Sequence, residues 1–263
     1  VGASGDLAPL AHLWLVLFGE GEAVVDGVRM NGAEALAQAN VQPLALEAKE
    51  GLALINGTHL MAGIGALAFV DVGRLQRASL AAASMAIDAC RATDSFLDDR
   101  IHVARTQLGQ RRVAQLLRRA IAGSQILTSH REHDPRVQDP YCLRAMPQVI
   151  GAAFDAIDFA RGIVERELGA VTDNPLVFSE DASIVSGGNF HGMPLAIAFD
   201  TLKIAITHLA GIAERRVNWL LAASDSENPV HIYLSPQPGL HSGLMIAQYT
   251  AAACCNELQT LAH

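Results

Sequence analysis

The sequence has few aromatic residues and no run of positive charge. Phe, Trp and Tyr make up 5% of its 263 residues, while hydrophobic residues together make up 51%, so the apolar mass is mostly Ala, Leu, Val and Ile. That composition favours close-packed helices over a β-sandwich or barrel. The formal net charge is −8. Without a basic run, a nucleic-acid or anionic-membrane role has little support.

Several motifs of common enzyme classes are also missing. No Rossmann or P-loop glycine pattern occurs, and Ser4 does not lie in a G-x-S-x-G elbow. His130 and His133 are the one close histidine pair and lack a Cys or carboxylate ligand set at the usual spacing, so we expect no metal site. The four cysteines form no CxxC, and Cys254 and Cys255 are adjacent, which is unlike a disulfide framework.

These absences predict a cytoplasmic protein with reduced thiols. Val1 begins no signal peptide, and no apolar run reaches membrane-spanning length without interruption. The mean hydropathy of +0.24 is high for a monomer with a fully solvated surface, and it indicates buried subunit contacts.

What is present is helical periodicity, so we expect a mainly α fold in one helical domain over residues 1–263. "AVVDGVRM" has an Asp-Gly centre between short β-branched runs, which predicts a hairpin in an irregular segment near residues 19–32. "GAEALAQAN" predicts a short helix. The longer predicted helices are residues 7–18, a segment from 45 onward, 75–94, 110–129, 147–170, 195–224 and 241–262. Residues 75–94 are apolar on most faces, which is typical of a helix buried among others.

One polar cluster lies in "VQDPYCLR". If Pro140 opens a helix, Tyr141 and Arg144 share one face. A tyrosine hydroxyl beside a guanidinium suits a carboxylate ligand, since arginine can bind a carboxylate with two parallel hydrogen bonds. The alternative is a surface arginine in an ion pair.

Three other segments carry polar residues in small or Gly-rich settings. Asn56 precedes Gly57 in "LALINGTHL", which is also typical of a helix end. "SGGNFHG" places Phe190 and His191 between glycines, where backbone can approach a ligand closely, or where the chain simply makes a tight loop. Residues 3–6, "ASGD", read locally as a turn in which Asp6 caps a helix.

Taken together, these segments resemble a known family. In order along the chain they are "GASGDLAPLAH", "LALINGTHL", "VQDPYCLRAMPQV", "TDNPLVF", "SGGNFHG" and "HSGLMIAQYTAAA". The set is similar to the histidine ammonia-lyase and aromatic amino acid ammonia-lyase family, and the resemblance covers essentially the whole chain. It implies a long-helix bundle assembled as a homotetramer with composite active sites. Family members are about twice as long, which implies that this chain is a central fragment, inactive alone, with its N- and C-terminal parts absent.

The resemblance also implies a prosthetic group made from the chain itself. In that family Ala3-Ser4-Gly5 would cyclise: the Gly5 amide nitrogen attacks the Ala3 carbonyl carbon, and two waters leave, one of them from Ser4. The product is methylidene-imidazolone (MIO), an electrophile. Asp6 resembles the carboxylate that assists the dehydration. No metal or nucleotide cofactor is implied.

Site roles carry over by the same resemblance. Arg144 would bind the substrate carboxylate, and Asn56 would hydrogen-bond the imidazolone oxygen. Phe190 would pack beside the imidazolone. The remaining implied site residues are Gln138 and Tyr141, which would line the pocket and stabilise charge, and His191, which is typical of the histidine branch.

The implied reaction removes ammonia from an aromatic L-amino acid, and the wording of the motifs favours L-histidine giving urocanate. His59 and His241 stand where an amide residue is expected in that branch. A phenylalanine or tyrosine ammonia-lyase, or a 2,3-aminomutase, therefore stays open. A non-catalytic helical assembly protein is the alternative from another class, but it would have no reason to keep the whole pocket set.

Overall fold

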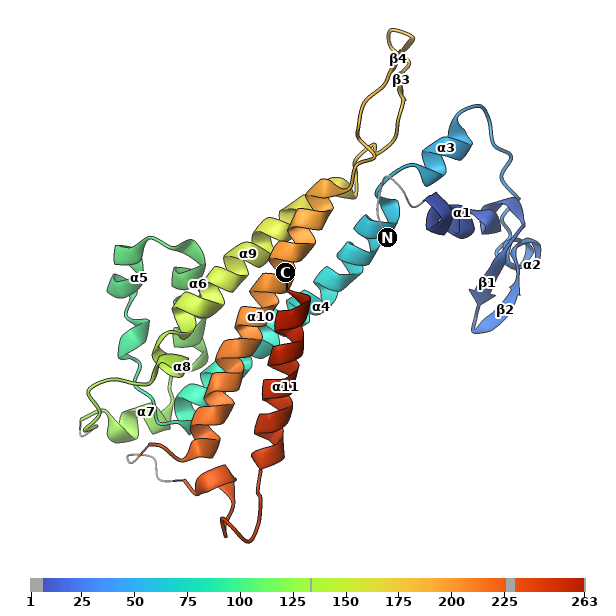
Figure 1. The fold of residues 1–263 in the computed structure, drawn as a ribbon. Coiled ribbons are helices and arrows are strands. Elements are labelled where there is room, and N and C mark those ends of the chain that lie inside the picture. The colour runs from blue at the N-terminus through green and yellow to red at the C-terminus, as the bar shows by residue number, and fades with distance from the viewer. Residues whose placement is uncertain (1–6, 133, 226–229, 263) are drawn as a thin grey trace. The chain divides into compact units, whose positions relative to one another are not determined.

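The computed structural model describes residues 7–132, 134–225 and 230–262 and contains two compact units (Figure 1). The first unit is drawn from Val1–Ala68 and Gly162–Ala198, and the second from Phe69–Arg161 and Phe199–His263. The chain passes between them within three long helices: α4 (His59–Ala89), α9 (Met146–Glu167) and α10 (Met193–Ala222). The expected mainly α class is confirmed.

The first unit contains the predicted hairpin. Strands β1 (Glu22–Val25) and β2 (Val28–Asn31) pair antiparallel, with Val25 opposite Val28. Asp26 and Gly27 between them have φ values of 51° and 81°, as a two-residue hairpin turn requires. The unit also contains α1 (Leu7–Leu15), a 3₁₀ turn (Val16–Phe18), α2 (Gly32–Gln38) and α3 (Glu50–Ile55).

A second hairpin in this unit was not predicted. Strands β3 (Leu176–Phe178) and β4 (Ser183–Val185) pair antiparallel between α9 and α10. Each strand has three residues, and Val177, Ile184 and Val185 are exposed. Strands this short with apolar residues facing solvent show no alternation of apolar and polar positions for a sequence analysis to detect.

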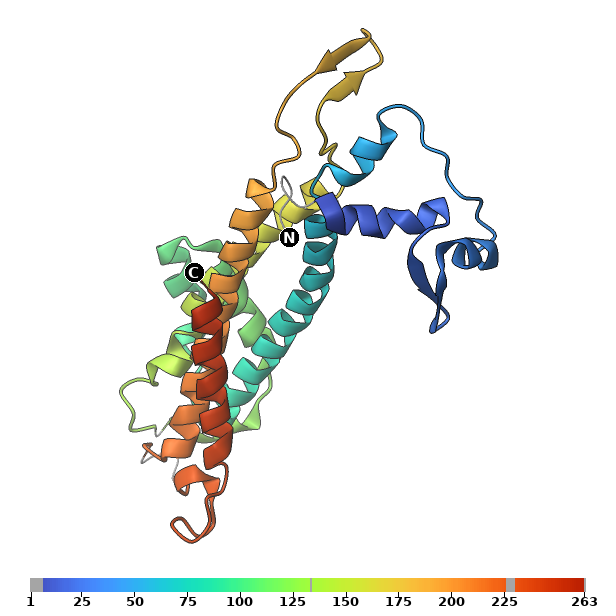
Figure 2. The same ribbon diagram turned by 45° about the vertical axis from the view of Figure 1, so that its right-hand side comes forward.

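The second unit is built of helices around one apolar core. Figures 1 and 2 show α11 (Met245–Leu261) alongside α10, and the Gln248 amide of α11 donates to Glu214 of α10 at 3.0 Å. Fully buried side chains of this core include Ile87, Leu97, Val113, Leu117, Met146, Ile150 and Ile157. The remaining elements are 3₁₀ turns at Ser95–Leu97 and Ile232–Leu234, α5 (Asp99–Arg105), α6 (Leu108–Ala120), α7 (Gln125–His130) and α8 (Tyr141–Arg144).

Three helix predictions need correction. The predicted helix from residue 45 onward begins at Glu50 and is interrupted around Gly57, because α3 ends at Ile55 and α4 begins at His59. The predicted helix 75–94 is the end of the longer α4, which ends at Ala89. The predicted helix 110–129 is two helices, α6 and α7. Gly123 between them has a φ of 82°, and the Ser124 hydroxyl caps α7 by accepting from the Leu127 N–H at 3.3 Å. This break was not predicted, because apolar residues keep their helical spacing across it.

Two helical stretches of the described chain, Glu50–Ala89 and Met193–Ala222, are long and apolar enough to cross a membrane by length and composition. Core helices of soluble proteins share that signature. Within α4, Ala83 and Ile87 are completely buried by protein, as are Leu195 and Ala198 of α10.

Glycines allow α6 and α9 to touch backbone to backbone in the second unit. A Cβ on Gly151 of α9 would lie 2.5 Å from the Gln110 Cα of α6, and a Cβ on Gly109 would lie 2.6 Å from the Asp155 Cγ. The Gly109 N–H instead donates to Asp155 Oδ2 at 3.0 Å. Any larger residue would push the two helices apart.

We therefore expect Gly151→Ala to lower stability by about 1–3 kcal/mol, because the added methyl group overlaps rigid backbone. The matched control is Gly73→Ala, a helical glycine of α4 whose Cβ would meet only the mobile end of Arg77 at 3.7 Å. Alanine there should be neutral or stabilising by up to about 1 kcal/mol. Thermal unfolding followed by circular dichroism measures both, and equal midpoints would contradict the close packing.

Candidate active site

The predicted site residues fall into three groups. Ala3, Ser4, Gly5 and Asp6 lie outside the described residues. In the first unit are Asn56, Phe190 and His191, and in the second unit are Gln138, Tyr141 and Arg144.

In the second unit, Tyr141 and Arg144 share a helix face as predicted. Pro140 has extended backbone angles and precedes the single-turn helix α8. The Arg144 guanidinium carbon lies 4.1 Å from the centre of the Tyr141 ring, a cation–π contact. Tyr141 is 73% exposed, and Gln138 is exposed in the loop before it.

Arg144 has an unused buried donor. Its Nε is buried and finds no hydrogen-bond partner in the described part of the chain, and none of the ion pairs found there involves it. The alternative reading, a surface arginine in an ion pair, therefore lacks support. A buried donor without a partner costs about 1–3 kcal/mol, and an added acceptor such as a carboxylate would remove that cost.

Tyr141 also lines a pocket of about 470 Å³ in the second unit. The wall opposite Tyr141 comes from α10 and includes His208, Asn218 and Trp219. A pocket of this volume can enclose a small molecule. Arg144 is not among its lining residues, so this pocket is separate from the unused arginine donor.

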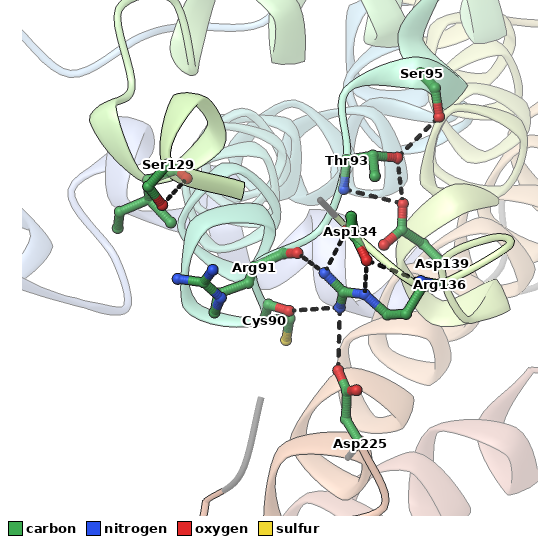
Figure 3. Close-up of polar contacts among 10 residues, drawn as sticks. Cys90, Arg91, Thr93, Ser95, Ser129, Asp134, Arg136, Asp139 and Asp225 are labelled. Atoms are coloured by element: carbon green, nitrogen blue, oxygen red, sulfur yellow. Dashed lines mark hydrogen bonds and ion pairs between the residues drawn. The ribbon is translucent and has the colours of Figure 1, made fainter. Parts of the chain in front are cut away.

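The loop before α8 contains a buried polar network that sequence analysis missed (Figure 3). Arg136 donates to Asp134 at 2.8 and 2.9 Å, to Asp225 at 3.1 Å, to the Cys90 carbonyl at 3.2 Å and to the Arg91 carbonyl. The three charged side chains are 9–13% exposed. The hydrogen bond from Arg136 holds the pKa of Asp134 below its ordinary value and raises the pKa of Arg136.

Asp139 is a second buried anchor in this loop. It is 3% exposed and accepts from the Thr93 N–H at 3.0 Å and from the Thr93 hydroxyl at 2.6 Å. The density of charge in "REHDPRVQDP" was the available signal. From the sequence alone, such a run of charged residues is interpreted as a solvent-exposed loop.

In the first unit, Asn56 ends helix α3, which confirms its interpretation as a helix-end residue. Its amide nitrogen donates to Asp173 Oδ1 at 3.2 Å and to the Asn174 carbonyl at 3.3 Å. An asparagine amide has two N–H groups, and both are engaged. Donation to an imidazolone oxygen would have to replace one of these contacts.

Asp173 therefore does more than form a turn in "TDNP". It accepts from Lys49 Nζ, from the Asn174 N–H at 2.7 Å and from Asn56. Burial alone would raise the pKa of Asp173, but these hydrogen bonds outweigh burial and hold the pKa below its ordinary value. A Cβ on Gly57 would overlap the Thr172 oxygens, so only glycine lets the two segments approach.

Phe190 and His191 lie in the loop that enters α10. The His191 N–H donates to the Gly188 carbonyl at 3.0 Å, which supports the tight-loop interpretation. His191 Nδ1 accepts from the Met193 N–H at 3.2 Å and so caps the start of α10. That contact assigns the ring proton to Nε2. Phe190 is half-buried and His191 is exposed.

Within residues 7–132, 134–225 and 230–262, no group of three or more His, Cys, Asp or Glu side chains is placed to hold a metal ion. The four cysteines are free thiols, and burial raises the pKa of Cys90 to about 12.

Comparison with known proteins decides the family. The sequence model of the family described as aromatic amino acid lyase matches residues 1–263. The chain belongs to the aromatic amino acid lyase family. The predicted long-helix architecture is that of this lyase family. The two long apolar helices of the described chain are partly buried within this fold.

Individual members of the lyase family are similar over the whole chain. A histidine ammonia-lyase of Geobacillus kaustophilus (strain HTA426) is 51% identical over 263 residues, which are 100% of this chain and 51% of that protein. The crystal structure of histidine ammonia-lyase from Trypanosoma cruzi has a TM-score of 0.85 at 38% identity, covering 100% of this chain and 49% of that one. A phenylalanine aminomutase of Pantoea agglomerans has a TM-score of 0.90 at 31% identity, covering 100% and 54%. The chain spans about half the length of the curated relatives it matches.

The Asp173 contacts predict a pH-dependent contribution to stability. Because the folded pKa lies below the unfolded value of about 3.9, the unfolded chain takes up the proton first as pH falls. The contribution is fully present above about pH 4–5 and is lost as pH falls through the folded pKa. Asp173→Asn should therefore cost about 2 kcal/mol at neutral pH, and this cost should shrink in acid.

Urea unfolding of both proteins between pH 3 and pH 8 measures this difference. Glu22→Gln is the control, because the Glu22–Arg29 pair in the same unit is exposed, at 58% and 73% respectively. A cost for Asp173→Asn that stays constant down to pH 3 would show that its charge does not matter.

Proposed function

We propose that the protein carrying this chain is a histidine ammonia-lyase, which converts L-histidine into urocanate and ammonia. The observation that carries the proposal is the 51% identity over the whole chain to a protein of that name. The unpartnered Arg144 Nε beside Tyr141 supports the reaction class, because every substrate of such a lyase carries a carboxylate.

Arg144 and Tyr141 would act on the substrate from one side. The Arg144 guanidinium would bind the α-carboxylate with a charge-assisted hydrogen bond from Nε. The Tyr141 hydroxyl, which the exposed ring presents to solvent in this chain, would donate to negative charge that develops during elimination. Gln138 of the preceding loop would line the same site.

The tripeptide Ala3-Ser4-Gly5 fits the prosthetic group of the family by its chemistry. Alanine and glycine are small enough for the backbone to fold back on itself, and serine supplies the hydroxyl that is eliminated. When formed, MIO supplies the electrophile that makes ammonia a leaving group. Asp6 would assist its formation, and Phe190 would exclude water beside it. Asn56 would hold it only by exchanging one of its present contacts with Asp173 and Asn174.

Assembly and location follow from the same family. We infer a homotetramer with composite active sites in the cytoplasm, in which the present chain alone would not turn over substrate. The exposed apolar side chains of α4 and α11 support buried subunit contacts, including Leu67, Met85, Ile246 and Leu261 at 58–72% exposure.

A 2,3-aminomutase is the second candidate, favoured by the similarity of the chain fold to a phenylalanine aminomutase. An aminomutase would return ammonia to the β-carbon, so the two reactions differ in product and not in the first step. A protein that assembles without catalysis would give neither product.

We expect the full-length protein to release urocanate and ammonia in equal amounts from L-histidine, and to act far more slowly on L-phenylalanine or L-tyrosine. Arg144→Met should lower kcat/KM by about 10- to 100-fold through a raised KM, because a charged hydrogen bond is worth about 1.5–3 kcal/mol. Arg119→Met, at an exposed site on α6, is the control. A β-amino acid product would identify an aminomutase, and no product from any of the three amino acids would exclude both.

The origin of the electrophile can be tested by mass. The purified full-length protein should weigh less than its translated sequence by two waters. Ser4→Ala lacks the hydroxyl that leaves as the second water, so its mass deficit should be smaller and turnover should be abolished. An active Ser4→Ala protein would overturn the assignment of Ala3-Ser4-Gly5.

A further inference from the structure

Arg136 connects three segments that are remote in sequence. Its guanidinium contacts the carbonyls of Cys90 and Arg91 after α4, Asp134 in its own loop, and Asp225 after α10 (Figure 3). The side chain is 13% exposed. Arginine has five N–H donors in a planar fork, and here they reach four acceptor residues in different directions.

Arg136 and Asp139 lie on either side of Gln138. Asp139 is held by both polar groups of Thr93, three residues beyond the Cys90 carbonyl that Arg136 contacts. Both ends of this short segment are therefore fixed to the same stretch of chain that follows α4. Helix α8, with Tyr141 and Arg144, begins two residues after Asp139.

Helix α8 is held by the packing of one fully buried side chain, Leu143. It is a single turn without a side-chain cap. Among the described residues, the polar contact of Arg144 is with the ring of Tyr141 on the same turn. The position of this pair relative to α4 and α10 therefore depends on the loop before it, as well as on the buried Leu143 within α8 and Met146 at the start of α9.

We propose that Arg136 is a positioning residue for the substrate-binding segment Gln138–Arg144. The proposal rests on the proposed function, in which Arg144 binds the substrate carboxylate. Arg136 itself touches no substrate. It holds the loop so that the unpartnered Nε of Arg144 meets the carboxylate at hydrogen-bonding distance. The arginine fork is required, because a lysine ammonium cannot reach two carboxylates and two carbonyls at once.

The test uses the full-length protein with L-histidine and compares four variants. Arg136→Met removes the charge and the fork, and Arg136→Lys keeps the charge alone. Arg131→Met and Arg131→Lys are matched controls in the same loop, because Arg131 forms one exposed ion pair with Asp94 at 2.8 Å. Each variant is measured for KM, kcat, thermal midpoint and the mass deficit of two waters.

A displaced Arg144 should raise KM. We expect Arg136→Met to raise KM about tenfold, because small displacements of a positioned binding group have effects of this size or larger. Arg136→Lys should recover part of the loss, and the Arg131 variants should match wild type. Partial unfolding would lower only the amount of active enzyme, and therefore kcat, leaving KM unchanged. If Arg136→Met yields no soluble protein, Arg136→Lys compared with Arg131→Lys decides.

Two failures can be told apart. If the wild type turns over L-histidine and both Arg136 variants keep the wild-type KM, the positioning role is wrong while the proposed function stands. The same rise in KM in an Arg131 control would also overturn the positioning role of Arg136. The other outcome is a wild-type protein that shows the mass deficit of two waters but does not act on L-histidine. In that case the proposed function is wrong, and the positioning role of Arg136, which rests on it, is wrong as well.

Discussion

A carboxylate removed from water must be met by donors, and this constraint shapes both units of the protein. Asp173 in the first unit and Asp134 and Asp139 in the second are nearly buried, and each accepts hydrogen bonds: Asp173 from Lys49 and Asn56, Asp134 from Arg136 of its own loop, and Asp139 Oδ2 from Thr93. Because an unpaired charge in these places would cost several kcal/mol, the loops that carry these residues have little freedom. Of the described candidate site residues, Asn56 donates to Asp173, and Gln138 and Tyr141 lie within two residues of Asp139 in the chain.

The long helices supply the fixed points to which these loops attach. Carbonyl groups at the end of a helix have no partner within it, and Arg136 uses those that follow α4. Close glycine packing between α6 and α9 then fixes the helices with respect to one another. Irregular segments with functional side chains are thus held by regular elements with an apolar core, as precise placement of side chains requires.

Local patterns in the sequence were enough for most helices, the first hairpin and the shared face of Tyr141 and Arg144. They failed where the deciding contact is remote. Asp173 pairs with Lys49, 124 positions away, and Arg136 pairs with Asp225, 89 positions away. Without its partner, each of these residues looks like part of a polar turn. The break at Gly123 was missed for the opposite reason, because apolar periodicity continues across it.

The helical scaffold does not by itself select a substrate. Lyases and aminomutases share this fold, so the difference between them must come from side chains in the site and not from the course of the backbone. His59 and His241, where the resemblance led us to expect an amide residue, are both exposed, and His59 begins α4 just after the Asn56–Gly57 turn. The turn is tied to Asp173, so His59 starts its helix from a fixed point.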